Sequence, residues 1–259
     1  MAEPLVRLET DGFVAIVILD RPEKLNALTA GMLAELEAIA VGLERRDDIR
    51  VVLLTGSGPK AFCAGADIAD WGAYAPLDFG RHWVREGHRI FDRWARLRQP
   101  LVAVLNGIAF GGGLELAACA DLRIAEAHAR LALPESRIGI IPGWSGTQRL
   151  VRRAGPTAVK RLALTGEPVD AEEARHLGLV DYVRPTGEGM TFARHLAATI
   201  AERAPIAVQT AKQLINAAEG EETAAAFEAV AGALAATTQD AAEGVAAFRT
   251  KRPATFTNR

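Results

Sequence analysis

Three short, almost wholly apolar runs limit the fold of this chain more than any other feature. They are IRVVLLTGSG at 49–58, PLVAVLNG at 100–107 and LRIAEA at 122–127. Short continuous apolar runs of this kind are typical of strands that are buried on both faces. Helical segments separate the runs, and this alternation predicts an α/β fold with parallel crossover connections.

Two further segments extend the α/β pattern, and a third forms an insertion within it. The stretch FVAIVILD at 13–20 predicts a strand, because β-branched residues alternate there with other apolar ones. Residues 29–46 predict a helix, with Thr29 as a suitable N-cap and apolar residues recurring at three- and four-residue intervals. The insertion 70–98, rich in Trp, Arg and His, predicts a loop and then a helix at about 79–98, and an insertion of this kind can supply a pocket wall.

The character of the chain changes beyond about residue 190, where alanine-rich helical segments follow one another with a break at Pro205. We therefore expect two parts. Residues 1–200 are predicted to form the α/β core that holds the functional site. Residues 201–259 are predicted to form a helical region that packs on the core or on a neighbouring subunit.

Composition argues against several classes of function. The 259 residues are 49% hydrophobic, which is enough to bury a full core. The formal net charge of −2 lacks the basic excess that nucleic-acid binding requires, so no nucleic-acid partner is expected. The sequence shows neither a charged start with an apolar signal region nor an apolar stretch of roughly 18 residues. It predicts a cytoplasmic protein without a membrane contact.

Cysteine and histidine usage predicts no metal site. Cys63 and Cys119 belong to no CxxC cluster, and the five histidines form no HxxxH or HExxH pair. Both cysteines are expected to be buried free thiols. Because Cys63 has no obvious histidine partner, a nucleophilic role for it is not favoured.

Three consecutive glycines at 111–113 stand directly before Glu115 and an apolar helical run. Their spacing fits neither the GxGxxG dinucleotide fingerprint nor a P-loop. Close packing of a helix on a sheet, or a tight turn, is one interpretation. In the other, a strand at 101–105 turns through the glycines into a helix at about 112–120, so that backbone N–H groups at the helix start face a ligand. Such groups stabilise developing negative charge.

A second acid, Glu135, follows Pro134 in an otherwise apolar segment, LALPESRIGIIPG. Two carboxylates on one cavity can divide acid and base work, one activating a water and the other supplying a proton. Each acid alone also fits an ordinary structural position, since an acid in the first turn of a helix interacts favourably with the helix dipole. The spacing of Glu115 and Glu135 does not show whether they converge.

Taken together, these elements resemble the crotonase superfamily of enoyl-CoA hydratases and isomerases. The matching segments run in family order: RPEKLNAL (21–28), KAFCAGADI (60–68), NGIAFGGGLELAACADLRIA (106–125), PESRIGIIPGWSGTQRL (134–150), LTGEPVDAEEARHLGLVDYV (164–183) and FRTKRPATF (248–256). The resemblance implies a spiral of repeated ββα units with a helical C-terminal trimerisation region. It also implies assembly as a homotrimer or as a hexameric dimer of trimers.

The resemblance implies a site as well. Backbone N–H groups of Ala66 and Gly112 match the family's oxyanion hole for the thioester enolate, and Glu115 and Glu135 match its two hydratase glutamates. Coenzyme A is then part of the substrate, and no separate cofactor is expected. Further predicted substrate contacts are Leu25, Ala64, Asp67, Ile68, Trp71, Gly143, Trp144, Phe248 and Lys251.

Three positions depart from the family pattern. Ala69 stands where many relatives have a lysine, which puts one contact with a CoA phosphate in question. Trp71 stands where relatives often carry a methionine-like residue, and Trp144 stands where the residue is usually small. Indole rings in the acyl site would shorten or reshape it, so we expect a short-chain or atypical acyl preference.

The implied activity is that of a lyase that reversibly hydrates a trans-2-enoyl-CoA to a 3-hydroxyacyl-CoA. A Δ3,Δ2-enoyl-CoA isomerase, in which a single glutamate moves the proton, is the nearest alternative. A non-catalytic acyl-CoA-binding subunit is a more distant one. The presence of both Glu115 and Glu135 favours the hydratase.

Overall fold

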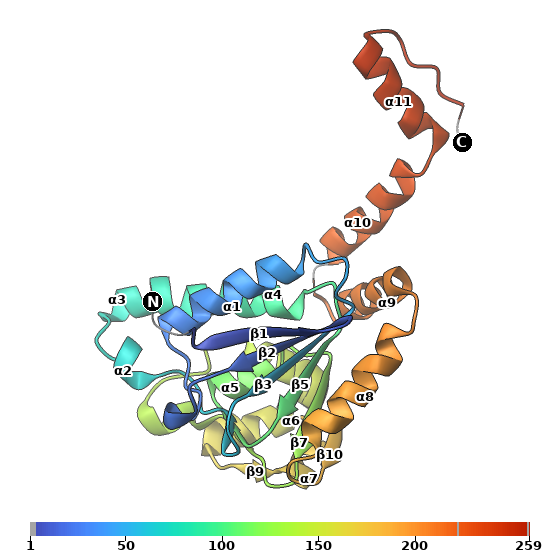
Figure 1. Cartoon of the computed structure of the whole chain (residues 1–259). Coiled ribbons are helices and arrows are strands. Elements are labelled where there is room, and N and C mark those ends of the chain that lie inside the picture. The colour runs from blue at the N-terminus through green and yellow to red at the C-terminus, as the bar shows by residue number, and fades with distance from the viewer. Residues whose placement is uncertain (1–3, 222, 258) are drawn as a thin grey trace. The chain divides into compact units, whose positions relative to one another are not determined.

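The computed structural model describes residues 4–221, 223–257 and 259. The chain divides into two compact units, Met1–Pro205 and Ile206–Arg259. Both β-sheets belong to the first unit, whereas the second is built of helices (Figure 1). Within the described part of the chain, no helix is long and apolar enough to cross a membrane.

The larger sheet has six strands in the order β1-β2-β3-β5-β7-β10. They are β1 (Val6–Asp11), β2 (Val14–Leu19), β3 (Val51–Gly56), β5 (Leu101–Leu105), β7 (Leu122–Glu126) and β10 (Tyr182–Arg184). Strands β1 and β2 form an antiparallel pair, and every other neighbouring pair is parallel. The predicted α/β class with parallel crossovers is therefore confirmed, although β1 was not predicted from the sequence.

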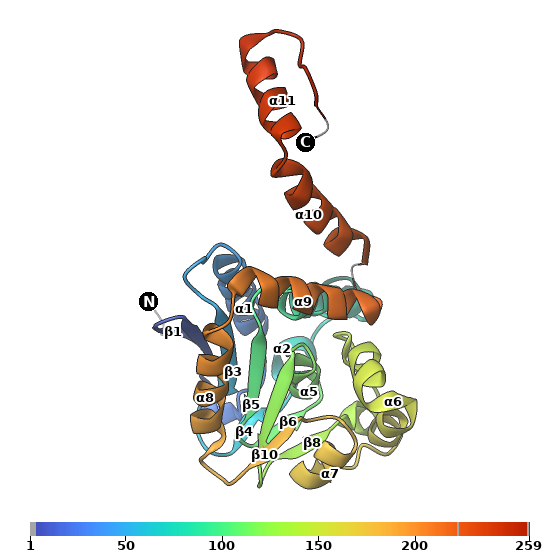
Figure 2. The same ribbon diagram turned by 90° about the vertical axis from the view of Figure 1, so that its right-hand side faces the viewer.

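The smaller sheet has four strands in the order β4-β6-β8-β9. They are β4 (Ala61–Cys63), β6 (Ile108–Phe110), β8 (Arg130–Ala132) and β9 (Val169–Asp170). Three times the chain passes from a strand of the larger sheet to a strand of the smaller one, as β3–β4, β5–β6 and β7–β8, and then continues into helices (Figure 2). This repetition is the ββα spiral that the family resemblance implies.

Helices fill the connections between the strands. The first unit has α1 (Ala30–Leu43), α2 (Ile68–Trp71), α3 (Pro76–Asp78), α4 (Arg85–Ala95), α5 (Gly112–Ala117), α6 (Gly146–Thr165), α7 (Ala171–His176), α8 (Gly189–Ala201), the 3₁₀-helices η1 (Pro22–Lys24) and η3 (Pro134–Ile138), and the π-helix η2 (Phe79–Val84). Pro205 begins α9 (Pro205–Ala218), and α10 (Thr223–Ala236) and α11 (Gln239–Thr250) follow. The predicted helix at 79–98 is thus a π-helix that continues into α4.

The predicted start of α1 is confirmed in detail. Thr29 is its N-cap, and the Thr29 side chain accepts a hydrogen bond from the backbone N–H of Met32 at 3.1 Å. Met32 and Leu36 of its apolar stripe are fully buried in the core, and Ile39 is partly buried against it. The helix ends at Leu43, earlier than the predicted residue 46.

The central strands β3 and β5 of the larger sheet are buried on both faces. Alternate residues of a strand point to opposite faces, and in β3 Leu53 packs in a cluster with Ala193 and Ala197 of α8. Its neighbours Val52 and Leu54 belong to the main core on the other face. This double burial explains the continuous apolar runs, because neither face of these strands meets water. It also leaves the carboxyl-terminal loops of the strands to form the site.

Candidate active site

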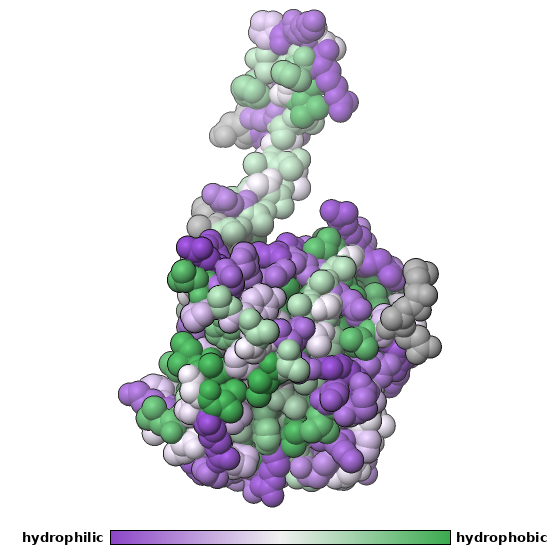
Figure 3. Space-filling view, turned by 90° about the vertical axis from the view of Figure 1, so that its left-hand side faces the viewer, coloured by the Kyte–Doolittle hydropathy of each residue, from purple (hydrophilic) through white to green (hydrophobic). Residues whose placement is uncertain are grey.

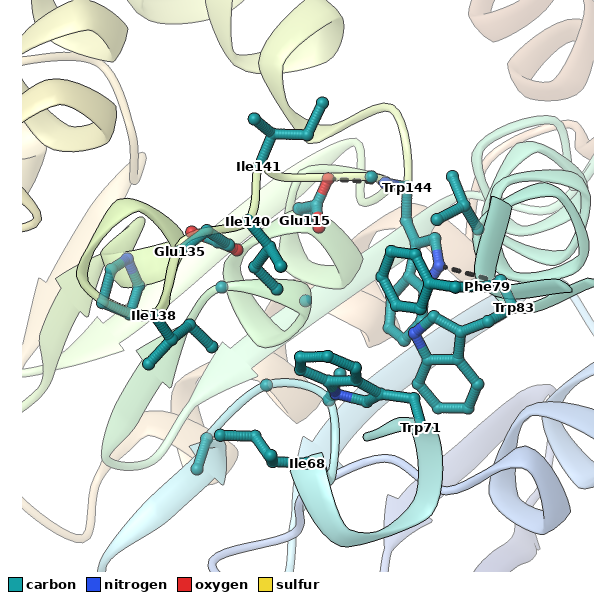
Figure 4. Close-up of a pocket in the computed structure, with 18 of the residues that line it drawn as sticks. Ile68, Trp71, Phe79, Trp83, Glu115, Glu135, Ile138, Ile140, Ile141 and Trp144 are labelled. Atoms are coloured by element: carbon teal, nitrogen blue, oxygen red, sulfur yellow. Dashed lines mark hydrogen bonds between the residues drawn. The ribbon is translucent and has the colours of Figure 1, made fainter. Parts of the chain in front are cut away.

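A pocket of about 270 Å³ lies among the segments that the sequence analysis singled out. Its lining comes from the loop 64–66 after β4, from the glycines 111–112 at the start of α5, from η3 and the loop that runs on to Trp144, and from α2 and η2. Figure 4 shows Glu115 and Glu135 in this pocket. The structure therefore settles what the spacing left open, since the two acids converge on one cavity.

Two backbone amides line the pocket side by side. The position that a Cβ would take on Gly112 lies 3.6 Å from the amide nitrogen of Ala66. Within the described part of the chain, neither amide donates a hydrogen bond to another backbone group. Gly112 is the first residue of α5, where helix geometry leaves N–H groups without an intrahelical acceptor. Two neighbouring N–H groups of this kind can stabilise negative charge.

The glycine run brings the main chain of α5 close to its neighbours. Gly111 has φ +50° and ψ −123°, a conformation that L side chains rarely adopt. A Cβ on Gly113 would lie 2.1 Å from the carbonyl oxygen of Cys63. Strand β6 precedes the glycines, so the turn leads from β6 rather than directly from the predicted strand at 101–105. Glycines occupy these positions because the main chain lies so close to its neighbours, more than because the chain must be flexible there.

Glu115 is only 2% exposed and is held by the backbone of the turn before α6. Its Oε1 accepts hydrogen bonds from the amides of Trp144 at 2.8 Å and Gly146 at 2.9 Å. Burial raises the pKa of Glu115, while these amides and the positive charge of Arg149 act in the opposite direction. The carboxylate form thus has fixed donors in an otherwise dry site.

Glu135 lies in η3, and its environment differs from that of Glu115. Burial, together with the negative charge of Glu115, raises the pKa of Glu135 to about 7. In the described structure its Oε2 is buried without a hydrogen-bond partner. Near neutral pH this carboxyl group is therefore protonated in about half of the molecules, and in that form it can give a proton to a bound molecule.

Aromatic rings form one wall of the pocket. Trp71 stacks on Phe79 with ring centroids 5.2 Å apart, and Trp83 packs on Trp144 at 5.3 Å (Figure 4). The indole of Trp144 donates to the carbonyl oxygen of Trp83 at 3.3 Å and is 3% exposed. Both tryptophans that depart from the family pattern, Trp71 and Trp144, therefore line the cavity. Their predicted effect on the acyl group stays a prediction.

Isoleucines also line the pocket, and three of them were not predicted from the sequence. Ile68 had been predicted, whereas Ile138, Ile140 and Ile141 had not, although they form the run RIGII directly after Glu135. The run RIGII was the feature of the sequence that could have identified these residues. Figure 3 shows apolar residues gathered on the surface that faces the viewer. Ile68 and Ile141 are 53% and 80% exposed. The cavity is suited to an apolar group.

The insertion at 70–98 supplies a pocket wall, as expected, but its residues Phe79, Trp83 and Val84 could not be chosen from the sequence. They lie in the π-helix η2, whose wider turn does not follow the spacing of an α-helix. Pattern reading based on 3.6 residues per turn therefore fails at this segment. π-Helical turns often occur at functional sites, and this one faces the pocket.

The other predicted contact residues do not all line this pocket. Ala64 and Gly143 line the same pocket, whereas Leu25 lines a second one of about 230 Å³ with Gly58 and Lys60.

Asp67 makes contacts within the protein. It accepts from the amide of Ala69 at 3.0 Å as the N-cap of α2, and it pairs with Arg21 at 2.6 Å. Phe248 and Lys251 belong to the second unit, where Phe248 is 87% exposed and Lys251 ends α11 with φ +53°. The roles predicted for these three residues in substrate binding stay predictions.

Both cysteines are buried free thiols, as expected. Burial raises the pKa of Cys63 to about 12, although its loop adjoins the two amides of the pocket. A thiol with this pKa is not a nucleophile at neutral pH. The carboxyl groups that line the pocket are those of Glu115 and Glu135.

The sequence model of the enoyl-CoA hydratase/isomerase family matches residues 9–259. The short-chain-enoyl-CoA hydratase of Clostridium acetobutylicum is 39% identical over 249 residues, covering 95% of each chain. The crotonyl-CoA hydratase of Syntrophomonas wolfei is 36% identical over 260 residues, covering 99% of each chain. Both similarities extend over nearly the full length of this protein.

Solved structures agree with the sequence comparisons. An enoyl-CoA hydratase from Bacillus anthracis superposes with a TM-score of 0.82 and 35% identity, over 98% of this chain and all of that one. DspI of Pseudomonas aeruginosa also has a TM-score of 0.82, with 35% identity over 98% of this chain and 97% of its own. The fold, the converging site and these similarities lead to one conclusion: the chain belongs to the enoyl-CoA hydratase/isomerase family.

Proposed function

We propose that this protein reversibly hydrates trans-2-enoyl-CoA thioesters to 3-hydroxyacyl-CoA. The observation that carries the proposal is the meeting of Glu115 and Glu135 with the amides of Ala66 and Gly112 on one apolar pocket. Relatives named as a short-chain-enoyl-CoA hydratase and a crotonyl-CoA hydratase support it. Coenzyme A is part of the substrate, and the chemistry uses no separate cofactor.

The reaction divides between the two acids. Glu115, whose Oε1 is held by two amides, accepts a proton from the water that attacks the β-carbon. Electrons move to the thioester oxygen, and the amides of Ala66 and Gly112 stabilise this enolate. Glu135 then gives its proton to the α-carbon, so that H and OH have both been added. A proton passing from Glu115 to Glu135 restores the starting state.

The remaining predicted residues and the assembly complete the proposal. The pocket lined by Leu25, Gly58 and Lys60 accepts part of the coenzyme A moiety. Phe248 and Lys251 contribute to a CoA site in the assembled protein, which is a homotrimer or a dimer of trimers. Helices of the second unit supply the contacts between subunits. Sedimentation of the purified protein measures the number of subunits directly.

The activity is tested by the loss of the conjugated enoyl-thioester absorbance when purified protein is added to crotonyl-CoA. Hydration also yields 3-hydroxybutyryl-CoA, identified by mass. If 3-enoyl-CoA is converted to 2-enoyl-CoA while no hydrated product forms, the protein is an isomerase instead. If acyl-CoA binds and no thioester is converted, the site is a binding site only.

We further propose that the acyl group is short. Trp144 fills the space beside Gly112, because a Cβ on that glycine would lie 2.7 Å from Cζ3 of the indole. Gly87 of α4 makes room for the same ring, since a Cβ there would lie 2.3 Å from Nε1. At about 270 Å³ the cavity lies just below the range of about 300–1,000 Å³ that is usual for drug-sized ligands.

Replacing Trp144 by alanine should lengthen the accepted acyl chain. Removal of the indole opens the wall between the thioester end of the pocket and Phe91, whose ring centroid is 5.0 Å from that of Trp144. We expect the ratio of kcat/KM for 2-octenoyl-CoA to that for crotonyl-CoA to rise at least about tenfold. Trp144→Phe, which keeps part of the wall, serves as the control. An unchanged ratio in Trp144→Ala means that the ring does not limit the chain.

The pH dependence of kcat/KM should follow the protonation of the pair Glu115 and Glu135. The active state holds one proton, on Glu135 for hydration, and this proton leaves with a pKa of about 7. We expect kcat/KM to fall above this pH, approaching about tenfold per unit. Hydration neither consumes nor releases a proton. The kcat/KM for dehydration should therefore fall above the same pH. Initial rates from pH 5 to 9 in both directions test this, and a flat profile up to pH 9 contradicts it.

A further inference from the structure

The turn before α6 places a serine in a conformation that favours glycine. Ser145 has φ +67° and ψ 10°, in the left-handed region. It lies between Trp144 and Gly146, the two residues whose amides hold Oε1 of Glu115. The backbone conformation of Ser145 therefore determines whether both amides point at the same oxygen.

The side chain of Ser145 is buried in a polar cluster with α4. Its Oγ lies 2.8 Å from Nδ1 and 2.9 Å from Nε2 of His88, and it donates to Oδ1 of Asp92 at 3.5 Å. Asp92 lies one turn after His88 on the same helix, and its Oδ2 is 3.5 Å from Nε2 of His88. The serine is thus tied to a helix that is distant in sequence from the turn.

Asp92 also links the cluster to α6. It forms a salt bridge with Arg149, which is 5% exposed and lies in the first turns of the helix that Ser145 caps. Arg96 lies 3.7 Å from the same carboxylate. Gly87, next to His88, receives the ring of Trp144. Helix α4 therefore contacts the turn both through Trp144 and through the Ser145 cluster.

We propose that Ser145, His88 and Asp92 are positioning residues, which hold the turn so that the amides of Trp144 and Gly146 stay on Glu115. The inference rests on the proposed function, because it assigns to these residues the alignment of the base that activates water. None of the three reaches the reacting atoms. Their effect passes through the backbone, and the polar contacts of Ser145 compensate for its left-handed conformation.

This arrangement predicts a change that a merely structural role would not cause. The two amides favour the carboxylate form of Glu115, so losing their alignment raises the pKa of that residue. The charged groups that act on Glu115 from neighbouring elements, Arg149 of α6 and Glu135 of η3, remain in place when Ser145 is changed. Protonation of Glu115 removes the base, so the loss of activity that it causes at low pH should begin at a higher pH in the variant.

Two substitutions at Ser145 distinguish the effect of its side chain from the effect of its backbone conformation. Ser145→Ala removes the hydroxyl and leaves a residue that adopts φ +67° with strain, whereas Ser145→Gly removes the hydroxyl but adopts this φ freely. We expect kcat of Ser145→Ala to fall about 10- to 100-fold with little change in KM. Ser145→Gly should recover part of this loss. His88→Ala should resemble Ser145→Ala.

His176→Ala is the matched control, because His176 lies in α7 and its Nδ1 is 2.7 Å from the carbonyl oxygen of Glu172 in its own helix. The pKa of Glu115 is followed by NMR titration of protein carrying 13C-labelled glutamate, with Glu115→Gln identifying the signal. Ser145→Ala and His88→Ala should raise this pKa relative to the wild type, and His176→Ala should leave it unchanged.

The two proposals can fail separately. If the wild type hydrates crotonyl-CoA while folded Ser145→Ala and His88→Ala retain its kcat and the pKa of Glu115, the positioning role is wrong. If the wild type does not hydrate any enoyl-CoA, the proposed function fails. The NMR titration still tests in that case whether the cluster holds the amides on Glu115.

Discussion

Glu115→Gln and Glu135→Gln should each lower kcat for the hydration of crotonyl-CoA by about 10²- to 10⁴-fold, the usual contribution of a positioned acid or base. The glutamine at 115 keeps a carbonyl oxygen for the amides of Trp144 and Gly146, so the turn stays in place while the base is lost. The glutamine at 135 keeps the shape of the side chain and removes its transferable proton. KM should change far less than kcat in both variants.

Glu172→Gln provides the control for this pair, because Glu172 is an exposed residue of α7 that pairs with Arg175. Its kcat should equal that of the wild type. Single-turnover rates measured with saturating enzyme separate the chemical step from product release. Wild-type rates in both active-site variants contradict the mechanism with two glutamates. A large loss in one variant alone, together with isomerisation of 3-enoyl-CoA, supports the isomerase.

Gly113→Ala should lower kcat by about 100-fold or more, which is the effect of losing one oxyanion-hole donor. The added Cβ would meet the carbonyl oxygen of Cys63 at 2.1 Å, and a backbone atom cannot move aside alone. Helix α5 and the loop after β4 must therefore separate. The amide of Gly112 travels with the helix and that of Ala66 with the loop, so the two donors no longer share one oxygen.

The control for this prediction is Gly42→Ala, at an exposed position of α1 where a Cβ meets no atom within 4 Å. It should retain full activity. Gly113→Ala should also be less stable by about 1–3 kcal/mol because of overpacking, which thermal unfolding measures. Activity is therefore compared at a temperature at which circular dichroism shows both variants folded. Wild-type kcat in folded Gly113→Ala would contradict the role of this close contact.

The comparison of sequence and structure shows which features local patterns encode. The strand β3 and the helix α1 follow from runs long enough to display a period. The strands β4, β6 and β8 have three residues each, too few for any period, and they are fixed by pairing with one another across the smaller sheet. The ββα spiral was accessible only through the family resemblance.

The residues of the site likewise include some that the local sequence reveals and others that it does not. Gly112 and Glu115 stand out because a glycine run before an acid is unusual, and the position of Glu135 after Pro134 is visible too. Their convergence depends on the spiral, which no spacing reveals. Ser145 gave no signal at all, since its importance arises from a backbone angle and from contacts with His88, which is 57 residues away.

The burial of Glu135 also connects the site with the folding equilibrium. Its pKa is about 7 in the folded protein, against an ordinary value of 4.5 that applies to the unfolded chain. Between these two values unfolding releases a proton, so rising pH favours the unfolded chain. The contribution of this residue to stability is complete below about pH 4.5 and is lost as the pH rises through about 7. The proposed proton donor is therefore maintained at the expense of stability in neutral solution.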